Sequence, residues 1–148
     1  MKTNTLVAVL ASLPLIGIGA PALAADKSPV GEDKVVYHVN DTEDQAGNAL
    51  RNIGNHLEVN PKAKIVVVTH ARGVDFLLNN AKDKNGNPYH VRVEQLKNQG
   101  VQFDVCQITL RNRKMTKDQF IPESSFVPSG VAEITRLQQR EGYAYLRP

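Results

Sequence analysis

Residues 65–70 read Ile65-Val66-Val67-Val68-Thr69-His70, and this stretch decides the fold. Four apolar β-forming residues in an unbroken row are typical of a strand covered on both faces, as strands are in a parallel sheet. On either side, the chain alternates short β-rich runs with segments of helical periodicity. This alternation predicts an α/β fold with three α/β/α layers, in which helices cover both faces of a mainly parallel, five-stranded sheet.

The other four strands are expected at residues 34–39, 101–106, 126–127 and 143–146. Helices are expected at 42–58, 74–78, 89–98, 108–113, 116–120 and 130–140. Asp41 or Thr42 can cap the first helix, Asn60-Pro61 ends it, and Gly100 follows the helix at 89–98 as a C-cap. The polar stretch 79–88 is expected to be a surface loop.

Residues 1–25 have the pattern of a cleaved export signal. Lys2 supplies the positive charge, Leu6 to Gly19 is apolar, and small residues around Ala24 and Ala25 offer two cleavage sites. The apolar run is short for a bilayer span and is interrupted by Gly and Pro. We therefore expect a periplasmic or otherwise exported protein with no membrane segment after cleavage. Residues 26–33 form a polar leader, and residues 34–148 form one domain.

The composition gives little support to several function classes. Without Lys2, the chain has 17 basic and 15 acidic side chains, a net charge of +2, and its densest basic cluster, Arg111 to Lys114, is short. Nucleic acid is therefore not an expected partner. No glycine-rich phosphate-binding motif occurs, and the single cysteine and the histidines lack metal-ligand spacing. The sequence predicts no cofactor and no metal.

Cys106 is the only cysteine in the sequence. A lone thiol in an exported chain cannot close an internal disulfide, so it is buried and inert, paired with another chain, or available for chemistry. It ends the predicted strand 101–106, and a helix is expected to follow. Amide N–H groups at the start of that helix could lower the thiol pKa, as could Arg111 or Arg113, whose directions the sequence leaves open.

Other strand ends bring polar residues to the same edge of the predicted sheet. His70 could exchange protons beside Cys106, and Arg72 with Gly73 could form an anion-binding turn. The candidate anion-binding residues are Arg72, Gly73, Asn40, Asp41, Ser129 and Gly130. Ser129 is expected to cap the last helix, whose first amides could hold an anion. His38 reads as structural within its strand, and His56 and His90 as solvated.

The chain resembles the DsrE/DsrF-like family, in the branch of small single-domain proteins related to YchN. The resemblance covers residues 34–148 and is carried by the runs 34–41, 68–74, 100–106 with Thr109-Leu110, 127–131 and 141–146. It implies a flavodoxin-like or Rossmann-like three-layer fold and assembly into homo-trimers or hexamers. In the family's sulfur-relay members, the cysteine resembling Cys106 carries persulfide sulfur between donor and acceptor proteins. The same resemblance makes His70 a site residue.

Two features differ from that family pattern. The turn reads His70-Ala71-Arg72-Gly73, where His-Gly-Pro-Gly is expected, and the best understood relay members are cytoplasmic. Two functions therefore remain open at this point. In the first, Cys106 accepts sulfane sulfur, holds it as a persulfide and passes it to a partner thiol. In the second, the protein is a non-catalytic oligomeric binding module for a small anion, and Cys106 only lines the site.

Overall fold

The computed structural model describes residues 31–148. The predicted export signal and most of the predicted leader lie outside the described residues. Among residues 31–148, no helix combines the length and apolar character needed to cross a membrane.

The described chain alternates strands with helices and short helical turns. The strands are β1 (Lys34–Val39), β2 (Lys64–Thr69), β3 (Gln102–Cys106), β4 (Ser124–Val127) and β5 (Ala144–Leu146). The helices are α1 (Gly47–Val59), α2 (Tyr89–Asn98), α3 (Gln107–Arg113) and α4 (Gly130–Glu141). Shorter helical turns are η1 (Thr42–Ala46), which runs into α1, η2 (Ala71–Leu77) and η3 (Lys117–Gln119). Strands and helices thus fall where the sequence predicts them, within a few residues.

The five strands form one sheet in the order β4-β3-β2-β1-β5, and every neighbouring pair is parallel. The expected α/β fold is confirmed. The chain adds β2, β3 and β4 on one side of β1 and then crosses back to place β5 on the other side. The strand order therefore reverses between β1 and β5. In sheets of this kind, that reversal opens a crevice at the carboxyl ends of the strands.

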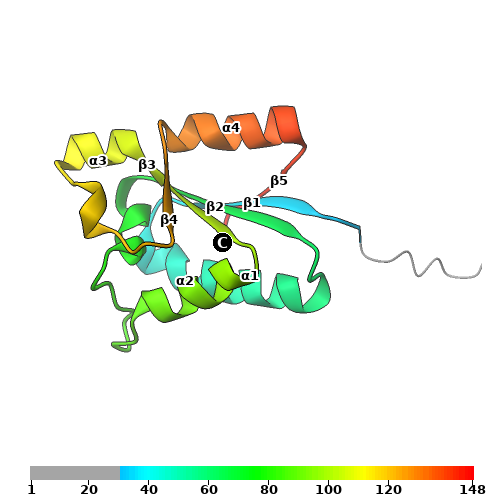
Figure 1. Ribbon diagram of the computed structural model, residues 1–148, viewed down its shortest axis with the longest axis horizontal. Coiled ribbons are helices and arrows are strands. Elements are labelled where there is room, and N and C mark those ends of the chain that lie inside the picture. The colour runs from blue at the N-terminus through cyan, green and yellow to red at the C-terminus, as the bar shows by residue number, and fades with distance from the viewer. Residues whose placement is uncertain (1–30) are drawn as a thin grey trace, which may run out of the picture.

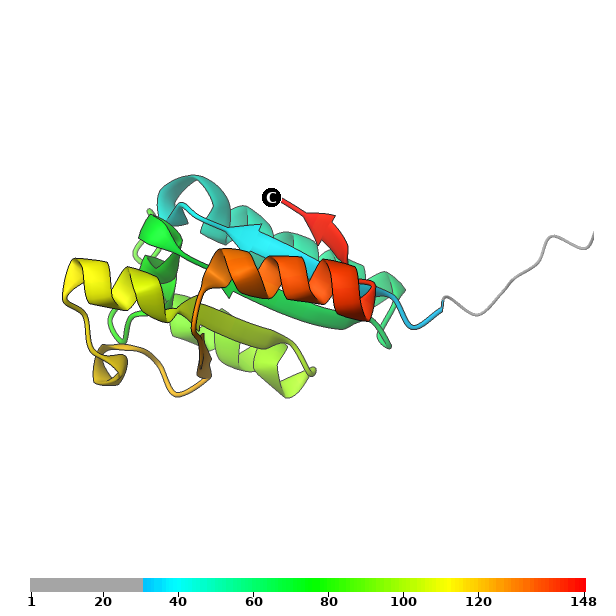
Figure 2. The ribbon, with the colours of Figure 1, turned by 90° about the horizontal axis from the view of Figure 1, so that it is seen from above.

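Helices cover the two faces of the sheet unequally (Figures 1 and 2). Helices α1 and α2 lie on one face, over the larger core cluster, which includes Val35, Tyr37 and Val39 of β1. Helix α4 crosses the other face, where Ile134 and Leu137 pack against Val36 and other valines. Helix α3 extends beyond the carboxyl end of the sheet (Figure 1). Because side chains alternate along a strand, His38 points to the same face as Val36, the α4 face.

Local signals explain where several elements begin and end. Asp41 caps the first helical segment, because its side chain accepts from the backbone N–H groups of Glu43 and Asp44. Ser129 caps α4 by accepting from the N–H of Ala132, as expected. Gly100 has a φ of 95°, a conformation that glycine adopts without strain. The cap and turn residues in the sequence therefore set these boundaries.

Strand β4 is longer than the sequence indicates. It begins at Ser124, and Ser124 and Ser125 pair with Phe103 and Asp104 of β3. Serine has little preference for strands, so the pattern alone indicates only Phe126 and Val127. Pairing with β3 extends the strand across residues that have no β signal of their own.

Candidate functional site

Cys106 ends β3 and forms part of the wall of an open pocket of about 310 Å³. The residue is 4% exposed, and its thiol is free of disulfide bonding. The pocket is lined by His70, Ala71, Cys106, Ile108, Thr109, Asn112, Arg113, Ser129 and Val131. Ile108 and Val131 are exposed apolar side chains at 39% and 59%. The thiol is therefore recessed behind an apolar rim and reachable through the pocket.

The sulfur of Cys106 is surrounded by hydrogen-bond donors. Burial by itself raises the pKa of Cys106, but backbone N–H groups of Gly130, Thr109 and Ile108 and the hydroxyl of Thr109 outweigh it, and the net pKa is lowered. Each donor stabilises the thiolate more than the thiol. The amides come from the first turns of α3 and α4, which converge on the sulfur from two directions.

Thr109 orients its hydroxyl through a second contact. The backbone N–H of Ala71 donates to Thr109 Oγ1 at 2.9 Å, which leaves the hydroxyl hydrogen free to point at the Cys106 sulfur. Thr109 itself is buried. The side chain therefore connects the turn after β2 to the thiol at the end of β3.

Thr109→Val is expected to shift the ionisation of Cys106 to higher pH. Below its pKa a thiol is mostly protonated, so a higher pKa means less thiolate and slower alkylation near neutral pH. The variant also leaves the Ala71 N–H without its acceptor, which should cost about 1–2 kcal/mol of stability. The measurement is the pH profile of iodoacetamide alkylation. Thr109→Ser keeps the hydroxyl and serves as the control; equal profiles for both variants and the wild type would contradict the assigned role.

Gly130 allows α4 to approach the site closely. A methyl group at this position would lie 3.3 Å from the Cβ atoms of both Cys106 and His70 and 3.3 Å from the carbonyl oxygen of Thr69. The same register that pairs Thr69 with Val105 places His70 beside Cys106. The first residue of α4 thus sits over the thiol and the imidazole together. The structure brings Gly130, Ser129, His70 and Cys106 together around one pocket.

His38 reaches this side of the sheet as well, and it is not merely a structural strand residue. Its Nε2 lies 2.6 Å from Nε2 of His70, and its Nδ1 lies 2.7 Å from the hydroxyl of Tyr145. The three side chains come from β1, from the residue after β2, and from β5. Sequence reasoning missed His38 and Tyr145. The period-two alternation of β1 was the signal that could have placed His38 on the α4 face.

The two imidazoles are neutral at neutral pH. Burial lowers the pKa of His38 to about 4, with further lowering by the nearby His70 and Arg147 charges. Burial lowers the pKa of His70 as well. His56 is also not simply solvated, because its Nδ1 lies 3.3 Å from the Tyr37 hydroxyl. His90 is exposed, as expected.

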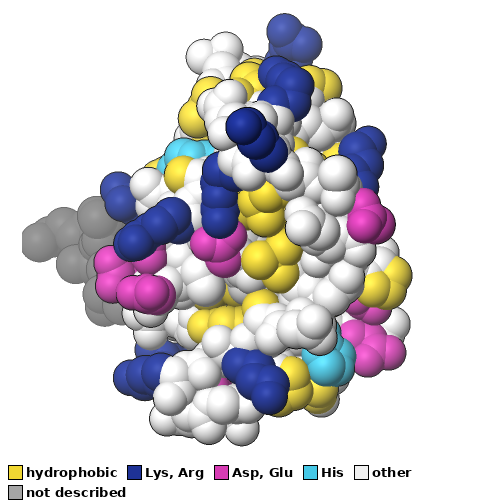
Figure 3. Space-filling view, turned by 90° about the vertical axis from the view of Figure 1, so that its left-hand side faces the viewer, with side chains coloured by type: hydrophobic (Ala, Val, Ile, Leu, Met, Phe, Trp, Pro, Cys, Tyr) yellow, Lys and Arg dark blue, Asp and Glu magenta, His cyan; other side chains and the backbone are white. Residues whose placement is uncertain are grey.

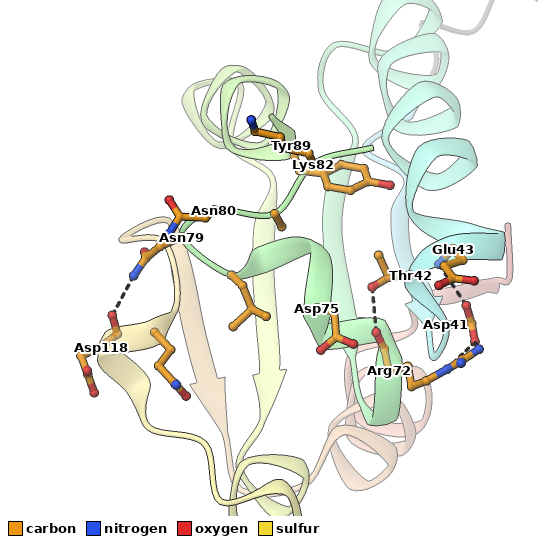
Figure 4. Close-up of a pocket in the computed structure, with 13 residues that line it drawn as sticks. Asp41, Thr42, Glu43, Arg72, Asp75, Asn79, Asn80, Lys82, Tyr89 and Asp118 are labelled. Atoms are coloured by element: carbon orange, nitrogen blue, oxygen red, sulfur yellow. Dashed lines mark hydrogen bonds and ion pairs between the residues drawn. The ribbon is translucent and has the colours of Figure 1, made fainter. Parts of the chain in front are cut away.

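The remaining predicted anion-binding residues lie away from the thiol. Asp41 and Arg72 form an ion pair in the wall of a larger, polar pocket of about 770 Å³, shown in Figure 4. The Arg72 guanidinium lowers the pKa of Asp41. Asn40 accepts a hydrogen bond from Arg147 at 3.3 Å. The strand ends thus supply two separate sites rather than one, and β1 contributes His38, not Asn40 or Asp41, to the thiol side.

Gly73 has a packing role. A methyl group there would lie 2.1 Å from the carbonyl oxygen of Val39, and the Gly73 N–H already donates to the carbonyl of His70 at 2.9 Å. The neighbouring Ala71 has a φ of 51°. This left-handed conformation costs a non-glycine residue about 1 kcal/mol, which explains why glycine would be the expected residue there. Ala71 also lines the thiol pocket, where a glycine would leave more space.

Basic side chains gather around the carboxyl end of the sheet. Figure 3 shows Lys and Arg side chains over the upper part of this end of the molecule, where α3 lies. Arg113 donates to Asp75 at 2.6 Å and to the carbonyl oxygen of Ala71 at 3.0 Å. Its charge is therefore directed at Asp75. The pKa of Cys106 is lowered by the hydrogen bonds described above and not by Arg113. Among the described residues, no group of three or more His, Cys, Asp or Glu side chains could hold a metal ion.

Fold and site together define a class: parallel α/β proteins with a free thiol at the carboxyl edge of the sheet. The model of the DsrE/DsrF-like family matches residues 33–148. The chain belongs to the DsrE/DsrF-like family.

Two solved structures are similar to it. One is the structure of MTH1491, a protein of unknown function from Methanobacterium thermoautotrophicum, whose sequence is 33% identical to this one. The two structures align with a TM-score of 0.64 over 78% of this chain and 99% of that chain. The ychN protein from E. coli is 16% identical, with a TM-score of 0.62 over 77% of this chain and 99% of that one, and shows the shared fold. No curated protein matches the sequence significantly.

Proposed function

We propose that this protein is an exported sulfur carrier that holds sulfane sulfur as a persulfide on Cys106. One observation carries the proposal: N–H groups from two helices and the Thr109 hydroxyl all point at a sulfur that lies in the wall of an open pocket. These donors favour the thiolate, which is the nucleophile. In the loaded protein these donors would stay beside the inner sulfur of a persulfide anion, whose negative charge they would help to stabilise.

The loading step can be written with a small persulfide R–S–SH as the donor. The Cys106 thiolate attacks the terminal sulfur, the S–S bond of the donor breaks, and a new S–S bond forms on Cys106. R–S⁻ leaves and takes up a proton. The reaction is an exchange between a thiol and a sulfane sulfur atom, so no external oxidant or reductant is needed. Unloading is the same exchange with an acceptor thiol.

The alternative is a small-anion binding module. It is less favoured by the pocket, because Ile108, Val131 and Ala71 give it an apolar rim and Arg113 is committed to Asp75. An anion would have to rely on the donors that already surround the sulfur.

Cysteine persulfide added to the purified protein tests the proposal. A mass gain of one sulfur atom, about 32 Da, is expected on the peptide that carries Cys106, and dithiothreitol should remove it. Two oxygen atoms add nearly the same mass, but a sulfinic acid withstands dithiothreitol. Binding of a small anion without any adduct would favour the binding module, and a reducible covalent dimer would point to pairing between two Cys106 thiols.

Export and assembly complete the proposal. The apolar stretch Leu6 to Gly19 and the small residues around Ala24 support export, with a mature chain that begins at Ala25 or Asp26. Family membership supports a homo-trimer or hexamer. The intact mass of the protein from the cell envelope fraction, and its sedimentation coefficient, test the two points.

A further inference from the structure

A chain of hydrogen bonds leads away from the wall of the thiol pocket. His70, which lines the pocket beside Cys106, contacts His38, and His38 contacts Tyr145. The ring of His38 also lies against the other two rings, with centroid distances of 4.7 Å to His70 and 5.7 Å to Tyr145. The chain crosses from β2 over β1 to β5 and ends at the reversal of strand order.

Each hydrogen bond between these three side chains contains a single proton. Two Nε2 atoms 2.6 Å apart cannot both carry hydrogen, so one imidazole donates and the other accepts. Neutral imidazoles carry one N–H and one bare nitrogen each, and Tyr145 can both donate and accept. In one arrangement, Nε2 of His70 donates to Nε2 of His38, and Nδ1 of His38 donates to the Tyr145 hydroxyl. Nδ1 of His70 is then free to accept a proton. In the opposite arrangement, Tyr145 donates to His38 and His38 donates to His70.

Loading that starts from the protonated Cys106 thiol releases a proton in the pocket, and this step rests on the proposed function. The thiol first loses its proton, and the thiolate then exchanges with the donor, so that Cys106–SH and R–S–SH together give Cys106–S–S⁻, R–SH and H⁺. One S–S bond breaks, one forms, and one proton must leave. A donor molecule that reaches the sulfur occupies the pocket mouth, which is where water would otherwise take up the proton.

The hydrogen-bonded side chains of His70, His38 and Tyr145 supply another exit for the proton. His70 accepts the proton at Nδ1 and releases its Nε2 proton to His38, His38 releases its Nδ1 proton to Tyr145, and Tyr145, which is 40% exposed, passes its hydroxyl proton to water. Protons and charge balance at every transfer.

We infer that His70, His38 and Tyr145 form a proton-transfer chain that connects the Cys106 pocket to solvent at the β1–β5 crevice. His38 and Tyr145 act through His70 and are positioning residues. Tyr145 lies on the edge strand β5, and two strands, β1 and β2, separate it from the strand of Cys106, so its hydroxyl can affect the sulfur exchange only through this series of hydrogen bonds.

The test is the rate at which cysteine persulfide loads Cys106 in weak buffer, with the protein in excess for single turnover. Tyr145→Phe and His38→Ala are each expected to slow loading roughly tenfold or more. Imidazole added to His38→Ala should restore the rate, because it can occupy the space left by the side chain. Alkylation of Cys106 by iodoacetamide at a pH well above the thiol pKa should stay at the wild-type rate in both variants, because the thiol is already ionised there and the rate reports access to the sulfur.

Tyr143→Phe is the matched control, since Tyr143 lies just before β5 and outside the chain, and it should load like the wild type. Wild-type loading by Tyr145→Phe would overturn the inference. So would the absence of imidazole rescue, or a parallel fall in alkylation, which would indicate a damaged pocket. A wild-type protein that accepts no sulfur would overturn the proposed function and this inference together, whereas equal loading by all variants would overturn the inference alone.

Discussion

Cys106→Ser is expected to abolish sulfur loading, because no other sulfur nucleophile exists in the chain. A serine hydroxyl at this position stays protonated and does not attack sulfane sulfur. The pocket and the surrounding amides should persist, since serine is smaller and accepts the same hydrogen bonds. The expected result is an unchanged mass after incubation with cysteine persulfide, against a gain of about 32 Da for the wild type.

Two controls make this result specific. Wild-type protein alkylated with iodoacetamide before the donor is added should behave like the variant. Circular dichroism should give the same spectrum for variant and wild type, which excludes loss of fold as the reason. A sulfur adduct on Cys106→Ser would place the acceptor elsewhere and remove the basis of the carrier proposal.

Gly73→Ala is expected to destabilise the protein by about 3 kcal/mol. The added methyl group would meet the Val39 carbonyl oxygen at 2.1 Å and its carbon at 2.5 Å. Both belong to the backbone at the end of β1, which pairs with Thr69 of β2 and accepts a hydrogen bond from the His70 N–H, so it cannot yield as a flexible side chain would. Relief requires η2 to move away from β1, and with it the turn that holds His70.

Chemical denaturation measures this loss, and Gly47→Ala is the matched control. Gly47 begins α1 with a φ of −61°, and nothing outside its own helix and its chain neighbours lies within 4 Å of the added methyl group. That substitution should stabilise the protein by about 0.5 kcal/mol, since alanine has less freedom to lose on folding. A cost below about 1 kcal/mol for Gly73→Ala would show that the contact between η2 and β1 is looser than the structure indicates.

The site was predictable only in part. Cys106 ends and His70 follows a strand that the sequence indicates clearly, and the sheet register places the two residues side by side. The donors to the sulfur were predictable in kind, as amides at helix starts, but Thr109 was not, because its role depends on a contact with Ala71. His38 and Tyr145 are 107 residues apart, and no local pattern connects them.

The sequence by itself determined the type and approximate bounds of most elements: the valine run of β2, the caps at Asp41 and Ser129, and the turn at Gly100 all act through local burial and backbone preference. The tertiary structure alone decided the strand order, the division of the polar strand ends into two pockets, and the chain from His70 to Tyr145. The physical reason is that each of these depends on the side-by-side packing of distant segments. Sequence periodicity reports which face of an element is buried, whereas the neighbour it meets there is chosen by the packing of the whole domain.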